Sequence, residues 1–150
     1  MDLDTQKDVL TNIGAYYPLQ LERENAVPVM RTAMFGNRED RSLICAGNVP
    51  QGSKIRFSLP PDFDVIDTVV AECTDLKNEK QQEADAMIMF SCISRYLSFG
   101  VMTSEEIERV EKVWNAPLVG FFSYGEFGKS KNGKHEFHNN TCCVVVLKEK

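Results

Sequence analysis

The stretch from Ala84 to Tyr124 constrains the fold more than any other part of the chain. An apolar run, Ala84–Cys92, is followed by a helix-like pattern beginning at Thr103 and then by a second apolar run, Leu118–Tyr124. A strand, a helix and a strand in this order predict two parallel strands joined by a right-handed crossover. Because the first run has few polar interruptions, we expect it to be a buried strand.

Two segments have helical periodicity. One begins at Thr103, which has the capping-box spacing with Glu106. The other begins after Pro60-Pro61, at Asp62 or Asp64. The apolar positions of the earlier helix are Ile66, Val69, Val70, Cys73 and Leu76. Those of the later helix are Ile107, Val110, Val113 and Trp114.

Upstream of these helices, short strand-like runs alternate with turn-rich segments. The runs are Leu19–Arg23, Val27–Phe35, Ser42–Ala46 and Ile55–Leu59. Connections this short favour an antiparallel meander. Residues 1–13 form a polar N-terminal segment, and we expect the domain itself to span residues 14–150.

The last unit is predicted to be a β-hairpin around Asn132-Gly133, the strongest short turn signal in the chain. A two-residue turn there would place Phe127 opposite His138. It would also put the side chains of Tyr124, Glu126, Asn139 and Thr141 on one face of the hairpin. The expected fold is therefore α+β: a single domain with a mixed, largely antiparallel sheet, two main helices and a C-terminal β-hairpin.

Composition excludes several classes of protein. The chain has 150 residues and a formal net charge of −5, whereas a nucleic-acid binder needs a basic stripe. The longest apolar run, Cys142–Leu147, is far shorter than a membrane span. The first residues do not form a secretory signal. Five cysteines, an odd number, favour free thiols in a reducing compartment. We expect a cytoplasmic protein that binds neither nucleic acid nor membrane.

Polar residues at the end of the first apolar run are the first candidate site. Ser91, Cys92, Ser94 and Arg95 come where a strand is expected to end and a loop to begin. Such sheet edges collect ligands, and the planar guanidinium of Arg95 suits a carboxylate. The alternative is that Cys92 is a small buried hydrophobe and Arg95 a solvated loop charge.

The second candidate is the glycine-rich segment 120–128, in which Glu126 is suited to an ammonium group. It lacks the lysine and hydroxyl of a phosphate loop. The alternative is that its glycines serve bulges or turns and that Glu126 is solvated.

The third candidate is His138-Asn139-Asn140-Thr141. His135 and His138 point to opposite faces of a strand, so no metal site is expected there. Cys92, His138 and Asn139 also have the residue types of a thiol hydrolase.

The spacing of these segments resembles the C-terminal domain of the FIST (F-box and intracellular signal transduction) family. Phe90-Ser91-Cys92 with Arg95, then Gly120–Gly128, then His138–Thr141, match the family forms "FSC-x-x-R", "GFYSYGEIG" and "HNQT". The earlier segments Tyr17–Leu21, Val29–Arg31 and Gly47–Ser53 resemble the family's "HPLG", "VVR" and "G-x-VPEGS". Among the departures, Asn140 stands where glutamine is usual, Phe127 replaces an aliphatic residue and Tyr17 stands where histidine often occurs.

The resemblance implies a non-enzymatic sensory domain that binds a small, amino-acid-like ligand. It also implies an N-terminal family half and a downstream signalling module as partners, of the kind found in bacterial relatives. A homodimer that covers the surface normally buried by that half is a further expectation. No cofactor is expected.

For such a ligand, Arg95 is the expected partner of the carboxylate and Glu126 that of the ammonium group. The other ligand-binding residues are expected to be Ser91, Cys92, Ser94, Tyr124, His138, Asn139 and Thr141. Two alternatives stay open: a hydrolase or transferase that depends on Cys92 and His138, and a scaffold or interaction domain without a ligand.

Overall fold

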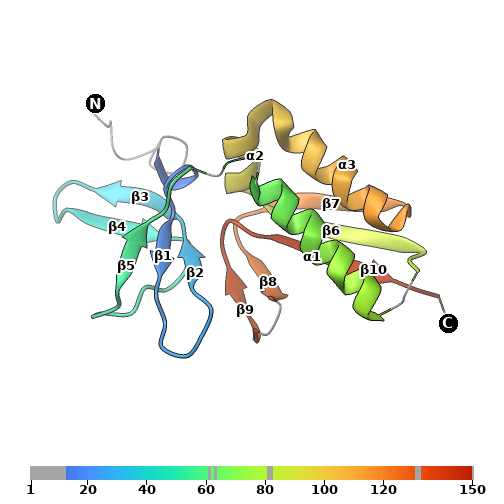
Figure 1. The fold of residues 1–150 in the computed structure, drawn as a ribbon. Coiled ribbons are helices and arrows are strands. Elements are labelled where there is room, and N and C mark those ends of the chain that lie inside the picture. Colours follow the sequence, from blue (N-terminus) through green and yellow to red (C-terminus); the bar gives the residue numbers. More distant parts are fainter. Residues whose placement is uncertain (1–12, 61, 63, 81–82, 131–132, 150) are drawn as a thin grey trace.

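The chain folds into two lobes, seen side by side in Figure 1. The computed structural model describes residues 13–60, 62, 64–80, 83–130 and 133–149. The first lobe contains strands β1 to β5, and the second contains helices α1 to α3 and strands β6 to β10. The predictions for residues 1–12 and for Asn132 lie outside the described residues.

The first lobe is built from a small sheet and a hairpin. Strand β1 (Leu19–Leu21) is flanked on both sides by antiparallel strands, β2 (Val29–Arg31) and β5 (Ile55–Phe57). Strands β3 (Ala33–Asn37) and β4 (Ser42–Cys45) form a separate antiparallel pair. The predicted meander is therefore wrong, because β5 pairs with β1 and not with β4.

The long strand predicted from Val27 to Phe35 is divided at Thr32, between β2 and β3. The Thr32 amide donates to Asn139 Oδ1 at 3.4 Å, and the Thr32 carbonyl accepts from the Ala46 amide at 2.9 Å. These two hydrogen bonds satisfy the backbone of Thr32 outside the β1–β2 pair, so one continuous strand is replaced by two short ones.

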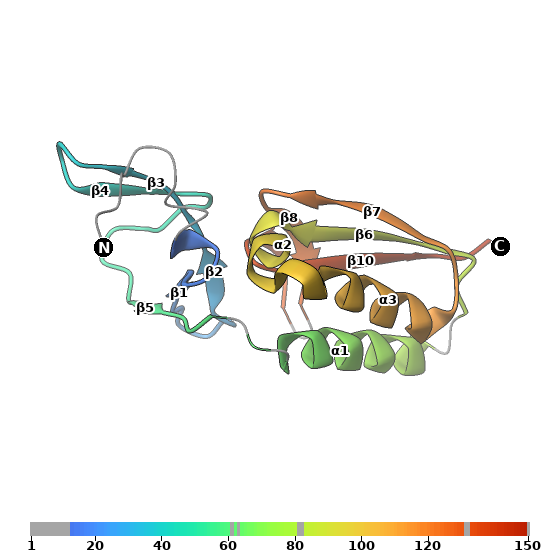
Figure 2. The same cartoon turned by 90° about the horizontal axis from the view of Figure 1, so that it is seen from above.

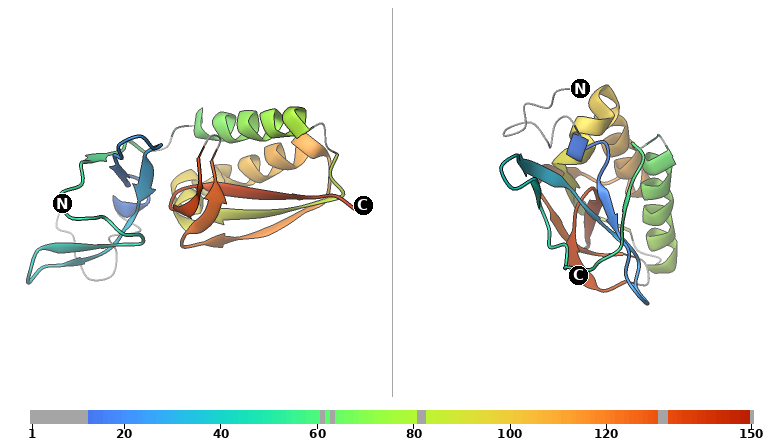
Figure 3. Two further views of the ribbon diagram at one scale, coloured as in Figure 1. Left: turned by 90° about the horizontal axis from the view of Figure 1, so that it is seen from below. Right: turned by 90° about the vertical axis from the view of Figure 1, so that its left-hand side faces the viewer.

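The second lobe contains the parallel pair that the sequence predicts. Strand β6 (Ala86–Cys92) runs parallel to β7 (Leu118–Ser123) and antiparallel to β10 (Cys142–Leu147), which gives the order β10-β6-β7. Helices α1 (Asp64–Lys80) and α3 (Thr103–Trp114) lie together along one side of this sheet (Figure 2; Figure 3, left).

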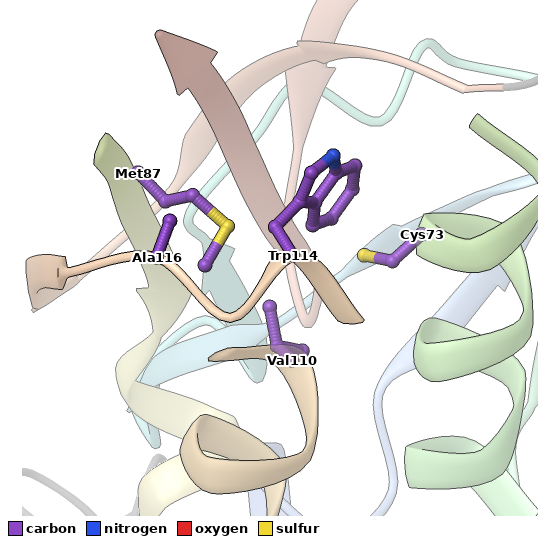
Figure 4. Close-up of a cluster of buried hydrophobic side chains, with 5 residues drawn as sticks. All are labelled: Cys73, Met87, Val110, Trp114 and Ala116. Carbon is purple, nitrogen blue, oxygen red and sulfur yellow. The ribbon is translucent and has the colours of Figure 1, made fainter. Parts of the chain in front are cut away.

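The core of the second lobe lies between these helices and β6. Met87 and Val110 are fully buried there, against Cys73 of α1, Trp114 of α3 and Ala116 just beyond it (Figure 4). The strand contributes Met87, Met89 and Ser91 to the buried side, as alternation along an extended chain requires.

Helix α3 begins at Thr103, as predicted, but the predicted capping box is wrong. The residue that caps the helix is Met102, and it makes no side-chain capping hydrogen bond. The Thr103 hydroxyl donates to the carbonyl of Gly100 at 2.7 Å. The Glu106 side chain is used elsewhere, because it is buried against Arg95.

The C-terminal hairpin is present, but its register differs from the prediction by one residue. Strand β8 (Glu126–Lys129) pairs with β9 (His135–His138), so that Glu126 lies opposite His138. The last paired residues are Lys129 and His135, and the connection between them is therefore longer than the predicted two-residue turn. A one-residue change of register moves every side chain of one strand to another neighbour.

The predicted α+β class is confirmed, with two main helices, mostly antiparallel pairing and a C-terminal hairpin. The strands are distributed over four sheets, of which β10-β6-β7 is mixed.

Substitution of two valines, the buried Val110 and the exposed Val101, tests where the core lies. Val110 is 0% exposed and Val101 is 92% exposed. We expect Val110→Ala to lower the free energy of unfolding by about 2–3 kcal/mol, because it removes buried methyl groups and leaves a cavity. Val101→Ala should change it by less than about 0.5 kcal/mol. Urea denaturation measures both, and equal effects would contradict this assignment of the core.

Candidate functional site

A buried ion pair joins three elements of the second lobe. Arg95 lies in helix α2 (Ile93–Phe99) and is 6% exposed, and Glu106 of α3 is 1% exposed. Arg95 Nε donates to Glu106 Oε1 at 3.1 Å, and Arg95 Nη2 donates to the same oxygen. The hydroxyl of Ser91, on β6, donates to Glu106 Oε2 at 3.4 Å.

This arrangement corrects the prediction for Arg95. Arg95 was expected in a loop, but residues 93–99 continue from the end of β6 directly into a helix. Cys92 caps that helix without a side-chain hydrogen bond, so the sequence carries no capping signal for it. The carboxylate beside Arg95 is Glu106 of the chain itself.

The guanidinium of Arg95 also reaches the segment that precedes β10. Its Nη1 donates to the carbonyl of Asn140 at 3.3 Å, and its Cζ lies 4.9 Å from the centre of the Phe99 ring. A guanidinium carries five N–H groups in a planar fork. The hydrogen bonds to Glu106 and Asn140 use the Nε–H and one N–H each of Nη1 and Nη2. One N–H group on Nη1 and one on Nη2 are left for a further acceptor.

A cavity of about 140 Å³ opens between the two lobes beside this guanidinium. Its polar wall comes from α2 and from the turn before β10, and its apolar wall comes mainly from the first lobe. The lining residues are Ala15, Pro18, Met30, Ser58, Leu59, Val65, Ser94, Arg95, Ser98 and Asn140. Both lobes therefore contribute residues to the lining of the cavity.

Asn140, one of the residues that line this wall, has an unused side-chain acceptor. Its Oδ1 is buried and has no hydrogen-bond partner among the described residues. The backbone of Asn140 has a φ of 58°, in the left-handed region that asparagine tolerates better than most residues. An unpartnered buried oxygen is costly, so a site that contains one is suited to a ligand or water that donates to it.

A larger cavity, about 380 Å³, lies within the first lobe. Its lining comes from residues 13–57 and includes Leu19, Leu43 and Phe57, with Arg38 and Arg41. None of the residues predicted to bind a ligand lines it. The smaller cavity is therefore the candidate site.

Glu126 does not line the candidate cavity but belongs to a separate buried cluster. It is 2% exposed, and it accepts hydrogen bonds from the hydroxyls of Ser123 at 2.8 Å and Thr141 at 2.9 Å. Burial raises the pKa of Glu126, and the hydroxyl hydrogen bonds oppose that rise only in part.

The side chain of Asn139 joins the two lobes, whereas that of Tyr124 lies apart. Asn139 is 0% exposed, and its Oδ1 and Nδ2 bond the Thr32 amide and the Tyr124 carbonyl. The Tyr124 side chain is 64% exposed, so only its backbone takes part. His138 is buried opposite Glu126, and its Nε2 has no hydrogen-bond partner within the described part of the chain.

The environment of Cys92 is unsuited to a nucleophile. Cys92 is 1% exposed, and burial, together with the nearby negative charge of Glu126, raises the pKa of its thiol. A thiol nucleophile needs a lowered pKa and an imidazole partner. The pKa values of Cys45, Cys73, Cys142 and Cys143 are also raised, each chiefly by burial.

The structure thus divides the predicted residues into separate groups. Ser94 and Arg95 line the candidate cavity, Ser91 supports Arg95 through Glu106, and Cys92 and Thr141 surround Glu126. Sequence reasoning missed Ser98 and the side chain of Asn140. The sequence marked Asn140 in one way, because an asparagine stands there where the resembled motif usually has glutamine. Nothing in the sequence marked Ser98.

Comparison with known protein families decides the family. The model of the FIST C domain matches residues 2–129. The chain belongs to the FIST C-domain family. No curated protein and no solved structure matches it. FIST C domains are associated with signal transduction and are not a known enzyme family.

The matched span of the FIST C domain ends within the C-terminal hairpin. It contains Ser91–Arg95 and Glu126, whereas His138–Thr141 lie beyond it. No helix of the described residues is long and apolar enough to cross a membrane. Within the same residues, no three His, Cys, Asp or Glu side chains are grouped as a metal site would require.

Two glutamates of the hairpin should respond to pH in opposite ways. Burial raises the pKa of Glu126, so its ionisation opposes folding as the pH rises through its folded pKa. Arg23 lowers the pKa of Glu136, so the stability that this pair contributes is lost as the pH falls through the folded pKa.

We therefore expect Glu126→Gln to gain stability relative to the parent as the pH rises above about 4.3, the ordinary pKa of a glutamate. Glu136→Gln should lose stability relative to the parent as the pH rises toward that ordinary value of about 4.3, and the difference should then stay constant at higher pH. Urea denaturation from acidic to neutral pH measures both differences. Parallel curves for the two variants would contradict these environments.

Proposed function

We propose that this FIST C domain binds a small amino-acid-like ligand in the cavity between its lobes and acts as a sensor. The observation that carries the proposal is that two residues lining one wall, Arg95 and Asn140, hold an unused donor and an unused acceptor. The Arg95 guanidinium has N–H groups left to donate, and the buried Oδ1 of Asn140 has no partner among the described residues.

The volume of the cavity limits the size of the ligand. A cavity of about 150 Å³ in a protein core accommodates one benzene molecule, and this cavity measures about 140 Å³. Glycine, alanine and serine have about as many non-hydrogen atoms as benzene. Larger amino acids would need the lobes to move apart.

The two polar groups fit the two ends of such a ligand. A ligand carboxylate would accept from Nη1 or Nη2 of Arg95, as bidentate arginine–carboxylate pairs do. A ligand ammonium group would donate to Asn140 Oδ1. This assigns the ammonium to Asn140 in place of Glu126, whose carboxylate already accepts from Ser123 and Thr141.

The ion pair with Glu106 holds the Arg95 guanidinium in position for this contact. Glu106 fixes the guanidinium plane through Nε and Nη2, and Ser91 orients Glu106. A fixed donor binds at a lower entropic cost than a mobile one.

The position of the cavity between lobes connects binding to signalling. Ala15, Pro18 and Met30 line it from the first lobe, and Arg95 and Asn140 line it from the second. A ligand that touches both walls favours one arrangement of the lobes over others, which is the thermodynamic requirement for a sensor. In this proposal the chain serves an intracellular signalling protein together with an N-terminal family half and an output module.

Asparagine-to-glycine substitution tests the ligand contact without disturbing the backbone. Glycine adopts a positive φ freely, so Asn140→Gly removes Oδ1 and keeps the turn. We expect glycine, L-alanine or L-serine to raise the melting temperature of the parent. Asn140→Gly should weaken that binding about 10- to 100-fold in calorimetric titration, the loss of one hydrogen bond to a charged group.

The matched control is Asn115→Gly, at another asparagine with positive φ (52°), at the end of α3 and away from the cavity. It should bind as the parent does. N-acetylglycine lacks the ammonium group and glycinamide lacks the carboxylate, so both should bind more weakly than glycine. The proposal fails if Asn140→Gly binds glycine as tightly as the parent, or if the parent binds none of the three amino acids.

A further inference from the structure

Strand β7 is an edge of the second-lobe sheet, and no described strand pairs with its outer side. It is the outer strand in the order β10-β6-β7, and Figure 2 shows it along the margin away from α1. Natural proteins protect such edges with lysine, proline, bulges or a covering segment. Residues 118–123 contain no charged residue and no proline, and Val119 and Phe121 are 66% and 62% exposed.

The opposite edge of the same sheet is different. Strand β10 contacts β8, and a Cβ added to Gly128 of β8 would lie 2.6 Å from Cys143 Sγ. Val145 and Leu147 of β10 are each 43% exposed, less than the corresponding residues of β7. The hairpin thus partly covers β10 and leaves β7 as the more open edge.

The hydrogen bonds of β7 to β6 show which of its backbone groups face outward. The Pro117 carbonyl accepts from the Met87 amide at 2.8 Å and so points to β6. Backbone groups of successive residues in a strand point to alternate sides. Leu118, Gly120 and Phe122 therefore direct their N–H and C=O groups away from β6, to the free edge.

These outward groups are arranged symmetrically about Gly120, and so they fit a second copy of the same strand. We propose that two copies of this chain pair through β7 in antiparallel orientation, about a two-fold axis at Gly120. Leu118 then exchanges both backbone hydrogen bonds with Phe122 of the other copy, and Gly120 does so with its own counterpart. Such an isologous contact is the commonest form of homodimer.

The same register brings exposed apolar side chains together. Val119 and Phe121 lie on the side of the sheet opposite α1 and α3, since Met87 and Met89 occupy the helix side. In the dimer, Val119 lies opposite Phe121 of the other copy, at a position where side chains approach closely. The pairing carries no charge repulsion, because the strand has no charged side chain.

The size of the contact predicts a weak dimer. One strand on each side buries less than the roughly 800 Å² per partner of a standard stable interface. We therefore expect a dissociation constant in the micromolar range, which appears as a concentration-dependent mass. Sedimentation velocity from about 1 µM to about 1 mM measures it directly.

Two double variants test both the surface and the register. Val119→Lys with Phe121→Lys places lysines opposite each other twice and should weaken the dimer at least about tenfold. Val119→Lys with Phe121→Glu places a lysine opposite a glutamate twice and should restore dimerisation, in a salt-dependent way. Circular dichroism checks that both variants fold.

The control is Val145→Lys, on the same side of the sheet but on β10, and it should dimerise as the parent does. Three results would overturn the proposal. They are a parent that stays monomeric throughout, a Val145→Lys variant weakened as much as the double-lysine variant, and a lysine–glutamate variant as monomeric as the double-lysine one.

Discussion

The buried pair of Arg95 and Glu106 is the interaction on which the second lobe and the candidate site both depend. It joins α2 to α3, takes a hydrogen bond from Ser91 of β6 and reaches the carbonyl of Asn140 before β10. Removing two charges from water costs several kcal/mol per ion unless their geometry and additional hydrogen bonds compensate for it. Here the geometry also holds a guanidinium beside the cavity between the lobes.

The second constraint is the set of contacts that joins the lobes around that cavity. Asn139 bonds the Thr32 amide, Arg31 reaches the Phe137 carbonyl at 3.3 Å, and the Ser98 hydroxyl donates to the Ala15 carbonyl at 2.9 Å. Each is a single hydrogen bond of modest net strength, and the ion pair of Arg23 with Glu136 joins the lobes as well. Contacts of this kind favour one arrangement of the lobes. Other arrangements are only slightly higher in free energy, so the binding of a small ligand can shift the equilibrium between them.

Features governed by local pattern could be predicted from the sequence. The apolar run that becomes β6, the start of α3 at Thr103 and the parallel partner β7 follow from periodicity and from the order of the elements. Features decided by tertiary contacts could not. Glu106 satisfies the capping-box spacing, yet the distant Arg95 takes its carboxylate, because a buried guanidinium needs a charged partner more than a helix end needs a cap.

The candidate site was predictable in part for the same reason. Ser94 and Arg95 were identified from residue type and motif, and both line the cavity. Glu126 was assigned to a ligand ammonium from its carboxylate and its motif, but tertiary packing buries it against Ser123 and Thr141. Asn140 contributes through an unpartnered side-chain oxygen at a positive φ, and apart from the asparagine standing where glutamine is usual, no pattern of residue types indicates such an environment.

Nuclear magnetic resonance of the Asn140 side-chain amide and the Arg95 Nε–H group during titration with glycine tests the central claim most directly. The account predicts that both signals shift together and saturate at one ligand concentration, while the side-chain amide of Asn115 stays unchanged. Saturable shifts confined to residues around the larger cavity of the first lobe, such as Leu43 and Phe57, would contradict it, as would no shift at all.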